Sequence, residues 1–181
     1  MSKKKSVCVF CGASDNVDKK FLEIGAEFGK LLAKRDITLV YGGGDCGVMG
    51  AVANSSMKHG GYAVGVFPRS LRNIENEHKS LSEITIVDTM HERKQNMFDR
   101  SDAFIVFPGG FGTMDEMFEI ITWKQLMLHD KPVVIFNYQG YWDPLIELMK
   151  NIIENRFAKA EVATYYHVVD ELEDIMDVLG Y

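Results

Sequence analysis

The sequence is poor in cysteine. Only Cys8, Cys11 and Cys46 carry thiols among 181 residues, and a small, odd number of cysteines does not suggest a disulfide framework. Cys8 and Cys11 have the C-x-x-C spacing, but Cys8 falls inside a strand-like run, whereas redox pairs occupy the turn and helix start that follow a strand. We therefore expect reduced thiols, with Cys8 and Cys11 buried as small apolar side chains.

The sequence also lacks a long apolar run and an excess of basic residues. No stretch approaches the roughly 18 apolar residues of a membrane span, and the lysines at positions 3–5 lead directly into a strand-like run rather than a signal-peptide core. Lys and Arg total 20 against 26 Asp and Glu, which gives a net charge of −6. Nucleic acids and anionic membranes require a basic face. We expect a soluble, cytoplasmic protein that binds neither a nucleic-acid polymer nor a membrane.

Metal-ligand patterns and the Walker A motif are absent as well. His59, His78, His129 and His167 lack metal-ligand spacing with other histidines, cysteines or acidic residues, so the sequence predicts no metal site. Neither of its glycine-rich loops ends in the Gly-Lys-Ser/Thr of a Walker A motif. Hydrolysis of ATP or GTP by that machinery is therefore not expected.

Short apolar runs recur along the chain where strands are expected. They cover residues 7–10, 38–41, 63–67, 84–87, 103–107, 132–136 and, more weakly, 167–169. Solidly apolar strands are typical of a parallel sheet that is covered by helices on both sides. Helix-compatible segments fill the gaps between them. The sequence thus predicts one α/β domain over residues 1–181, a Rossmann-like doubly wound parallel sheet with helices on both faces.

One expected helix, over residues 114–128, is apolar around most of its circumference. Its apolar band is wider than one sheet needs. We favour a subunit interface, and hence a homodimer, as the explanation. A core helix wedged between neighbours in a monomer is the alternative.

The first glycine-rich loop, over residues 42–47, follows an expected strand and opens an expected helix. It satisfies G-x-G-x-x-G, and glycines such as Gly43 and Gly44 allow backbone N–H groups to approach a phosphate. A dinucleotide site also needs an acidic residue about 20 positions further on, where this chain has Phe-Pro-Arg. Arg69 there would suit a 2′-phosphate, which leaves an NADP-binding interpretation open.

The second glycine-rich loop has the sequence Pro-Gly-Gly-Phe-Gly-Thr over residues 108–113, between an expected strand and the apolar helix. Gly109, Gly110 and Gly112 keep side chains away from an incoming anion, and Thr113 adds a hydroxyl. Free N–H groups at a helix start carry the positive end of the helix dipole. Two such loops in one small domain indicate a nucleotide ligand.

Charged residues near these loops have a functional and a structural interpretation. Glu116 stands three residues after Thr113, which is the spacing of a capping box that only satisfies helix N–H groups. Glu119 lies one turn further along the same face. Arg93 offers a two-pronged donor for phosphate or carboxylate, and Lys94 a point charge. For an isolated Arg-Lys pair, a solvated helix face is the more common explanation.

Four segments together closely resemble the LONELY GUY family. They are Tyr41-Gly42-Gly43-Gly44, Gly47-Val48-Met49-Gly50, Met90-His91-Glu92-Arg93-Lys94 and the P-G-G-x-G-T-x-x-E signature from Pro108 to Glu116. The resemblance extends from the strand end at residues 11–14 to Gly140-Tyr141, so it covers most of the chain. Members of this family are cytokinin riboside 5′-monophosphate phosphoribohydrolases, although many similar sequences were labelled lysine decarboxylases. They release an adenine-type base and ribose 5-phosphate.

The resemblance implies a nucleotide N-glycosidase without a cofactor, acting as a homodimer on a nucleoside 5′-monophosphate. It places the catalytic pair on Arg93 and Glu116 and favours catalysis over capping for Glu116. Substrate contacts are then expected from the end of the first strand, from both glycine loops, and from Glu75 and Lys94. They are Ser14, Gly43, Gly44, Glu75, Lys94, Gly109, Gly110, Gly112 and Thr113.

Two other classes of function remain to be distinguished. A non-catalytic nucleotide or cofactor carrier of the same fold would keep both glycine loops yet need neither Arg93 nor Glu116. A pyridoxal-phosphate lysine decarboxylase would need a Schiff-base lysine with a partner for the pyridinium nitrogen, and no such pair is identifiable in the sequence.

Overall fold

A computed structural model of the chain describes residues 4–73 and 76–181. Seven strands in these residues form one sheet, and every neighbouring pair of strands is parallel. The strands are β1 (Ser6–Phe10), β2 (Thr38–Tyr41), β3 (Ala63–Pro68), β4 (Glu83–Val87), β5 (Ala103–Val106), β6 (Val133–Phe136) and β7 (His167–Val169). They lie in the order β4-β3-β2-β1-β5-β6-β7. The predicted doubly wound parallel sheet is confirmed.

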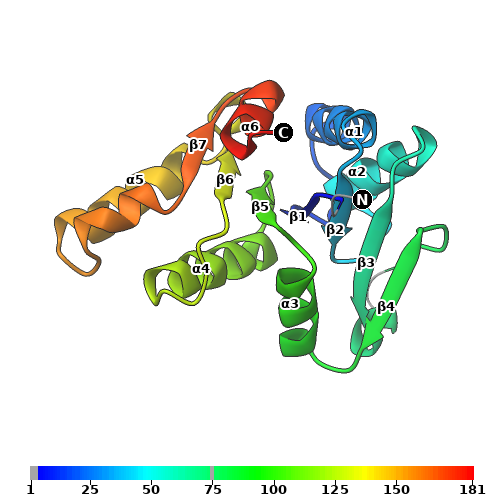
Figure 1. Cartoon of the computed structure of the whole chain (residues 1–181), viewed down its shortest axis with the longest axis horizontal. Coiled ribbons are helices and arrows are strands. Elements are labelled where there is room, and N and C mark those ends of the chain that lie inside the picture. Colours follow the sequence, from blue (N-terminus) through cyan, green and yellow to red (C-terminus); the bar gives the residue numbers. More distant parts are fainter. Residues whose placement is uncertain (1–3, 74–75) are drawn as a thin grey trace.

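Helices cover both faces of the sheet (Figure 1). They are α1 (Lys19–Lys34), α2 (Gly47–Lys58), α3 (Met90–Asp99), α4 (Phe111–Gln125), α5 (Asp143–Glu154) and α6 (Leu172–Leu179), with short 3₁₀ helices η1 (Arg69–Asn73), η2 (Tyr138–Gly140) and η3 (Ala160–Thr164). Helices α1, α2 and α6 pack on one face, whereas α3, α4 and α5 pack on the other. No helix in residues 4–73 and 76–181 has both the length and the apolar character that a membrane crossing requires.

Two apolar layers, one on each face, make up the core. Alternate residues of a strand point to opposite faces, so Phe107 packs against Phe28 of α1 at a ring-centroid distance of 4.8 Å. On the other face Phe104 stacks on Phe98 of α3 at a ring-centroid distance of 5.7 Å. All residues of β1, β5 and β6 are buried. This explains why these strands, apart from Ser6 at the start of β1, are solidly apolar rather than alternating.

Strands β1 and β5 lie side by side in the centre of the sheet, where the direction of winding reverses. From β1 the chain continues to β2 on one side, and from β5 it continues to β6 on the other. Loops that leave two such strands diverge and open a crevice at their carboxyl ends, which is where doubly wound sheets bind their ligands. In this chain both loops are rich in glycine and small residues.

The helix predicted over residues 114–128 is shifted toward the N-terminus of the chain. Helix α4 begins at Phe111, because Gly110 is extended and serves as the N-cap residue. The helix ends at Gln125, and Met127 then adopts a left-handed conformation with φ 59°. The N–H of Leu128 donates to the Trp123 carbonyl at 2.9 Å, which completes a Schellman turn. Three apolar residues at 126–128 therefore lie outside the helix and are exposed.

Candidate functional site

The crevice between β1 and β5 holds a cavity of about 210 Å³, which we call the Glu116 cavity. Its lining residues come from the ends of β1 and β5 and from the starts of α2, α3 and α4; they are Cys11, Gly12, Ala13, Met49, Met90, Arg93, Gly110, Gly112, Thr113, Asp115 and Glu116. The structure thus brings together five of the predicted site residues. Sequence reasoning did not single out Cys11, Met49 or Met90 as site residues.

The two loops touch directly at the bottom of the crevice. The Gly12 N–H donates to the Pro108 carbonyl at 3.1 Å. A Cβ atom on Gly109 would lie only 2.1 Å from Thr113 Oγ1 and 2.9 Å from the Gly12 nitrogen. The close approach of the two backbones therefore requires glycine at position 109.

The start of α4 forms one wall of the Glu116 cavity. Gly110 is the N-cap residue, and no side chain caps the helix. Added Cβ atoms at Gly110 or Gly112 would meet nothing within 4 Å, so the approach to the first N–H groups of α4 is open. Uncapped N–H groups at the positive end of a helix dipole form a favourable site for an anion. The predicted phosphate loop therefore has suitable geometry.

Glu116 lies inside α4 rather than at its start, so Thr113 and Glu116 do not form a capping box. The Glu116 side chain is only 11% exposed. Burial raises the pKa of Glu116 from its usual 4.5 to about 7, while the positive charge of Arg93 opposes this rise and the charge of Asp115 adds to it. Glu116 is thus a buried carboxyl group that titrates near neutral pH.

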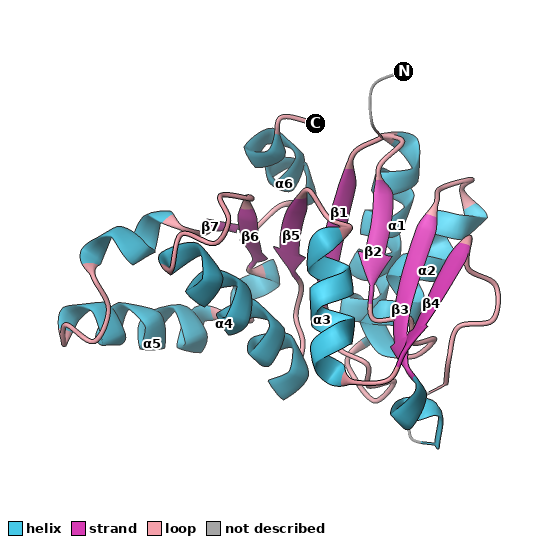
Figure 2. Ribbon diagram, turned by 60° about the horizontal axis from the view of Figure 1, so that its bottom comes forward, coloured by secondary structure: helices cyan, strands magenta, loops and turns pink. Residues whose placement is uncertain are grey.

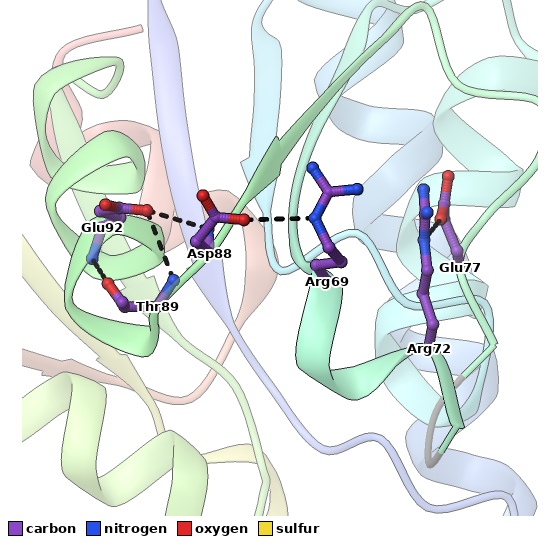
Figure 3. Close-up of polar contacts among 6 residues, drawn as sticks. All are labelled: Arg69, Arg72, Glu77, Asp88, Thr89 and Glu92. Carbon is purple, nitrogen blue, oxygen red and sulfur yellow. Dashed lines mark hydrogen bonds and ion pairs between the residues drawn. The ribbon is translucent and has the colours of Figure 1, made fainter.

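Arg93 reaches the cavity from α3. Figure 3 shows the polar contacts that hold the start of this helix. Thr89 Oγ1 accepts a hydrogen bond from the Glu92 N–H, and the Glu92 carboxylate accepts one from the Thr89 N–H, which is a capping box. The Asp88 N–H donates to the same carboxylate at 2.9 Å. Asp88 in turn pairs with Arg69 of η1 at 3.2 Å. These contacts fix the first turn of α3 and therefore the position of Arg93.

The Arg93 guanidinium is hydrogen-bonded to two backbone carbonyls. Its Nε donates to the Val66 carbonyl of β3 and its Nη2 to the Gly42 carbonyl after β2, each at 3.2 Å. Its Nη1 lies 3.8 Å from Oε1 of Glu116. The backbone thus uses two of the five N–H donors of the guanidinium. Its positive charge also favours ionisation of Glu116.

Lys94 points to a different set of carboxylates. Its Nζ lies 3.2 Å from Asp115 Oδ2 and 3.1 Å from Glu119 Oε1. Burial alone would lower the pKa of Lys94, but the hydrogen bonds to Glu119 and Asp115 raise it. The lysine is therefore a firmly protonated ammonium group that ties α3 to α4, and it does not line the Glu116 cavity.

Gly43 and Gly44, which were predicted to contact substrate, are buried under another segment. The Gly43 carbonyl accepts the His78 N–H at 2.9 Å, and Gly44 forms an antiparallel bridge with Glu77. Neither glycine lines the cavity. Glu75, the other expected contact in this region, lies outside the described residues.

A second, more apolar hollow of about 280 Å³ adjoins the Glu116 cavity and shares Gly12, Ala13 and Gly110 with it. Ser14 and Gly109 line this hollow rather than the cavity. Other walls are Phe21 and Tyr141, whose rings meet edge to face at 5.4 Å. The Tyr141 hydroxyl donates to the Gly109 carbonyl at 2.7 Å and so supports the phosphate loop. The sequence had marked Tyr141 only as part of the family resemblance and not as a site residue.

The Glu116 cavity is also lined by a thiol, that of Cys11. Burial, and then the nearby Glu116 charge, raise the pKa of the Cys11 thiol well above its usual range, so Cys11 stays protonated. Cys8 and Cys11 are both buried and free, as predicted. Within residues 4–73 and 76–181 no three His, Cys, Asp or Glu side chains are grouped so that they could hold a metal ion.

The family model described as "Possible lysine decarboxylase" matches residues 49–179. The chain is 42% identical over 158 residues to the "Probable cytokinin riboside 5′-monophosphate phosphoribohydrolase LOGL2" of Oryza sativa subsp. japonica, which covers 87% of this chain and 65% of that protein. It is 41% identical over 156 residues to the "Cytokinin riboside 5′-monophosphate phosphoribohydrolase LOG1" of Arabidopsis thaliana, covering 86% of this chain and 73% of that protein.

The chain belongs to the LONELY GUY family. The family model includes Arg93, Lys94 and the segment 109–116, but it begins after Ser14, Gly43 and Gly44. The chain spans about two thirds, 65%, of the length of the rice relative.

Solved structures share the same architecture as this LONELY GUY protein. A molybdenum cofactor binding protein from Rippkaea orientalis superposes with a TM-score of 0.75 at 18% identity, covering 99% of this chain and 98% of that chain. At this level of identity the likeness shows a shared fold and nothing about ligands.

Proposed function

We propose that the protein hydrolyses the N-glycosidic bond of an adenine-type nucleoside 5′-monophosphate, such as a cytokinin riboside 5′-monophosphate, and releases the free base and ribose 5-phosphate. One observation carries the proposal. A buried carboxyl group with a pKa near 7, Glu116, faces an arginine in a cavity whose other wall is an uncapped helix start. Relatives at 41–42% identity carry the name of this activity.

The reaction breaks the bond between C1′ of the ribose and the base nitrogen and forms a bond between C1′ and a water oxygen. Positive charge develops at the ribose as the base leaves. The Glu116 carboxylate stabilises that charge and accepts the proton that the water releases. The proton then passes to the departing base, so that no charge accumulates in the site. Arg93 keeps enough of Glu116 ionised at neutral pH for this to occur.

The 5′-phosphate is held by the start of α4. The N–H groups of Gly112 and Thr113, in the open first turn, meet the phosphate oxygens without interference from side chains. Holding the phosphate prevents the sugar from drifting away from Glu116, which converts binding energy into rate. Lys94 contributes positive charge near the site while it remains tied to Asp115 and Glu119.

Three free thiols are consistent with a reducing compartment, and we place the enzyme in the cytoplasm. We also propose a homodimer, because exposed apolar residues follow α4.

Incubation with AMP, followed by chromatography for adenine and ribose 5-phosphate, tests the activity. Stoichiometric release of both products is expected. A panel of N6-substituted AMP analogues, GMP, CMP and the corresponding nucleosides would define which base is preferred. A carrier of the same fold would instead protect the bound nucleotide and release no base.

Decarboxylation of lysine through a pyridoxal-phosphate Schiff base lacks a suitable amine. No lysine is among the described residues that line the Glu116 cavity. The nearest candidate, Lys94, is held as an ammonium ion by two carboxylates, whereas a Schiff-base lysine must be deprotonated to react. Incubation with pyridoxal phosphate and lysine should give neither aldimine absorbance nor carbon dioxide.

A further inference from the structure

We propose that Gly42 is a positioning residue for this reaction: the absence of a side chain at Gly42 lets the Arg93 guanidinium lie against the end of β2, where it is aimed at Glu116. The catalytic consequence rests on the proposed function, but the geometry does not. Gly42 would otherwise be taken as the first glycine of a nucleotide-binding loop.

Two backbone carbonyls from neighbouring strands fix the orientation of the guanidinium. The Gly42 carbonyl accepts from Nη2 and the Val66 carbonyl accepts from Nε, each at 3.2 Å. Because a guanidinium is a rigid plane with its donors in fixed directions, two anchors determine where the third nitrogen points. That nitrogen, Nη1, lies 3.8 Å from Oε1 of Glu116.

Backbone conformation does not explain the glycine at this position. Gly43 has φ 79°, in the left-handed region that favours glycine, but Gly42 is not among the described residues with positive φ. An alanine at position 42 would therefore cause no backbone strain.

The reason for the glycine is instead the guanidinium itself. A Cβ atom on Gly42 would lie 1.8 Å from Nη2, 2.9 Å from Cζ and 3.4 Å from Nε of Arg93. These three nearest atoms all belong to the end of one long side chain. That side chain can rotate away at little cost to the fold, so a methyl group here displaces Arg93 and leaves the backbone in place.

Displacement of Arg93 changes the electrostatic environment of Glu116. The charged groups that act on Glu116 are Arg93 and Lys94 from α3 and Asp115 and Glu119 from α4. Two thiols, Cys8 of β1 and Cys11 after it, also lie near Glu116, whose charge raises their pKa, so they stay neutral. Arg93 is the strongest of the groups that favour the ionised carboxylate. Its loss from this position leaves burial and the two acidic neighbours to favour the protonated form.

The variant Gly42→Ala tests the proposal. The titration of Glu116 is followed by ¹³C NMR of labelled glutamate carboxyl groups, with Glu116→Gln identifying the resonance. We expect its midpoint to rise by about one pH unit, the lower end of the effect of an opposite charge within a few ångströms. For AMP, kcat at pH 7 should then fall about fivefold and largely recover at pH 9.

Two further variants separate positioning from general damage. Gly61→Ala places a Cβ atom 2.4 Å from Ser56 Oγ and 2.9 Å from the Ser56 carbonyl, away from the cavity; it should lower the melting temperature without moving the Glu116 midpoint. The double variant Gly42→Ala/Arg93→Ala has room for the added methyl group, so its midpoint should equal that of Arg93→Ala alone.

An unchanged Glu116 midpoint in Gly42→Ala would overturn the proposal, as would a shift that persists when Arg93 is already alanine. Failure of Gly42→Ala to fold would also overturn it, since we expect the side chain and not the backbone to yield. The NMR titration needs no turnover. A wild-type protein that releases no adenine would therefore refute the proposed function while the titration still decides the role of Gly42.

Discussion

Nη1 of Arg93 lies 3.8 Å from Oε1 of Glu116, and the two side chains are only 9% and 11% exposed. The distance is longer than a hydrogen bond, so the pair interacts by charge rather than by a shared proton. Burial opposes ionisation of Glu116 and Arg93 favours it. The balance places the carboxyl group close to the point where a small change in pH or geometry alters its charge.

The first prediction concerns the pH dependence of turnover. If the carboxylate of Glu116 is the active form, kcat for AMP should rise with pH and level off above about pH 7. Below that value it should fall about tenfold per pH unit. Steady-state kinetics between about pH 5 and pH 9 would measure both the rise and the plateau. An acidic optimum would contradict the assignment of Glu116 as the carboxylate.

Stability should change with pH in the opposite direction. A carboxyl group whose pKa is raised on folding stabilises the folded state below its unfolded pKa and loses that contribution as pH rises through the folded pKa. For Glu116 the window lies between 4.5 and about 7, and the full effect is about 3 kcal/mol. Urea unfolding of wild type and Glu116→Gln across this window should show the decline only in wild type.

A second prediction concerns the phosphate. Adenosine lacks the group that the start of α4 would hold, so its kcat/KM should be lower than that of AMP on the order of 100-fold or more. Gly112→Val gives an independent test, because a Cβ at Gly112 meets nothing within 4 Å. This variant should fold normally but raise KM for AMP, since its side chain would stand at the cavity wall. Equal hydrolysis of adenosine and AMP would contradict a phosphate site.

Two segments of the sequence with the same spacing show what could and could not be predicted. Thr89 and Glu92 form a true capping box at the start of α3. Thr113 and Glu116 have the same spacing, but a capping box would require Thr113 to be the N-cap residue. In α4 the N-cap residue is Gly110, three positions earlier. The difference comes from Gly109, which lies close to the β1 loop, and from the extended Gly110 that follows it and becomes the N-cap residue. A local pattern does not contain that tertiary contact.

The fold was easier to predict than the contacts of the site. Short, solidly apolar runs predicted the parallel sheet, because burial on both faces leaves no polar positions in β5 or β6 and only Ser6 in β1. The anchors of Arg93, in contrast, are backbone carbonyls 27 and 51 positions away. Every residue has a carbonyl, so no side-chain pattern could have identified Val66 or Gly42 as its partners.

The third prediction is a homodimer that uses the apolar residues after α4. Leu126, Met127 and Leu128 are 59%, 90% and 64% exposed, and they are consecutive. Exposed apolar clusters of this kind commonly mark protein interfaces. Analytical ultracentrifugation at micromolar concentration should show a dimer, and Leu126→Glu should weaken it.

Tyr62→Glu provides the control for this experiment, because Tyr62 is exposed and directly precedes β3. Strand β3 lies away from α4 (Figures 1 and 2). It should leave the association unchanged. A wild-type monomer at micromolar concentration would contradict the prediction, and the apolar band of α4 would then serve only the core of one subunit.

The fourth prediction concerns Glu116→Gln, which keeps the size of the side chain and removes its charge. AMP should still bind, because the phosphate contacts at the start of α4 are untouched. Turnover should fall on the order of 100-fold or more, or about 3 kcal/mol, since the carboxylate acts mainly in the transition state. Isothermal titration calorimetry and steady-state kinetics on the same preparation would measure both.

Two controls separate this effect from loss of charge or of a helix cap. Glu147→Gln removes an exposed carboxylate from α5 and should leave kcat unchanged. Thr89→Ala removes a helix cap and should cost about 1 kcal/mol of stability. Glu116→Gln should not be destabilised above pH 7, because the substitution removes a buried negative charge. A destabilised Glu116→Gln that retains full kcat would refute the catalytic assignment, because only a structural role predicts that combination.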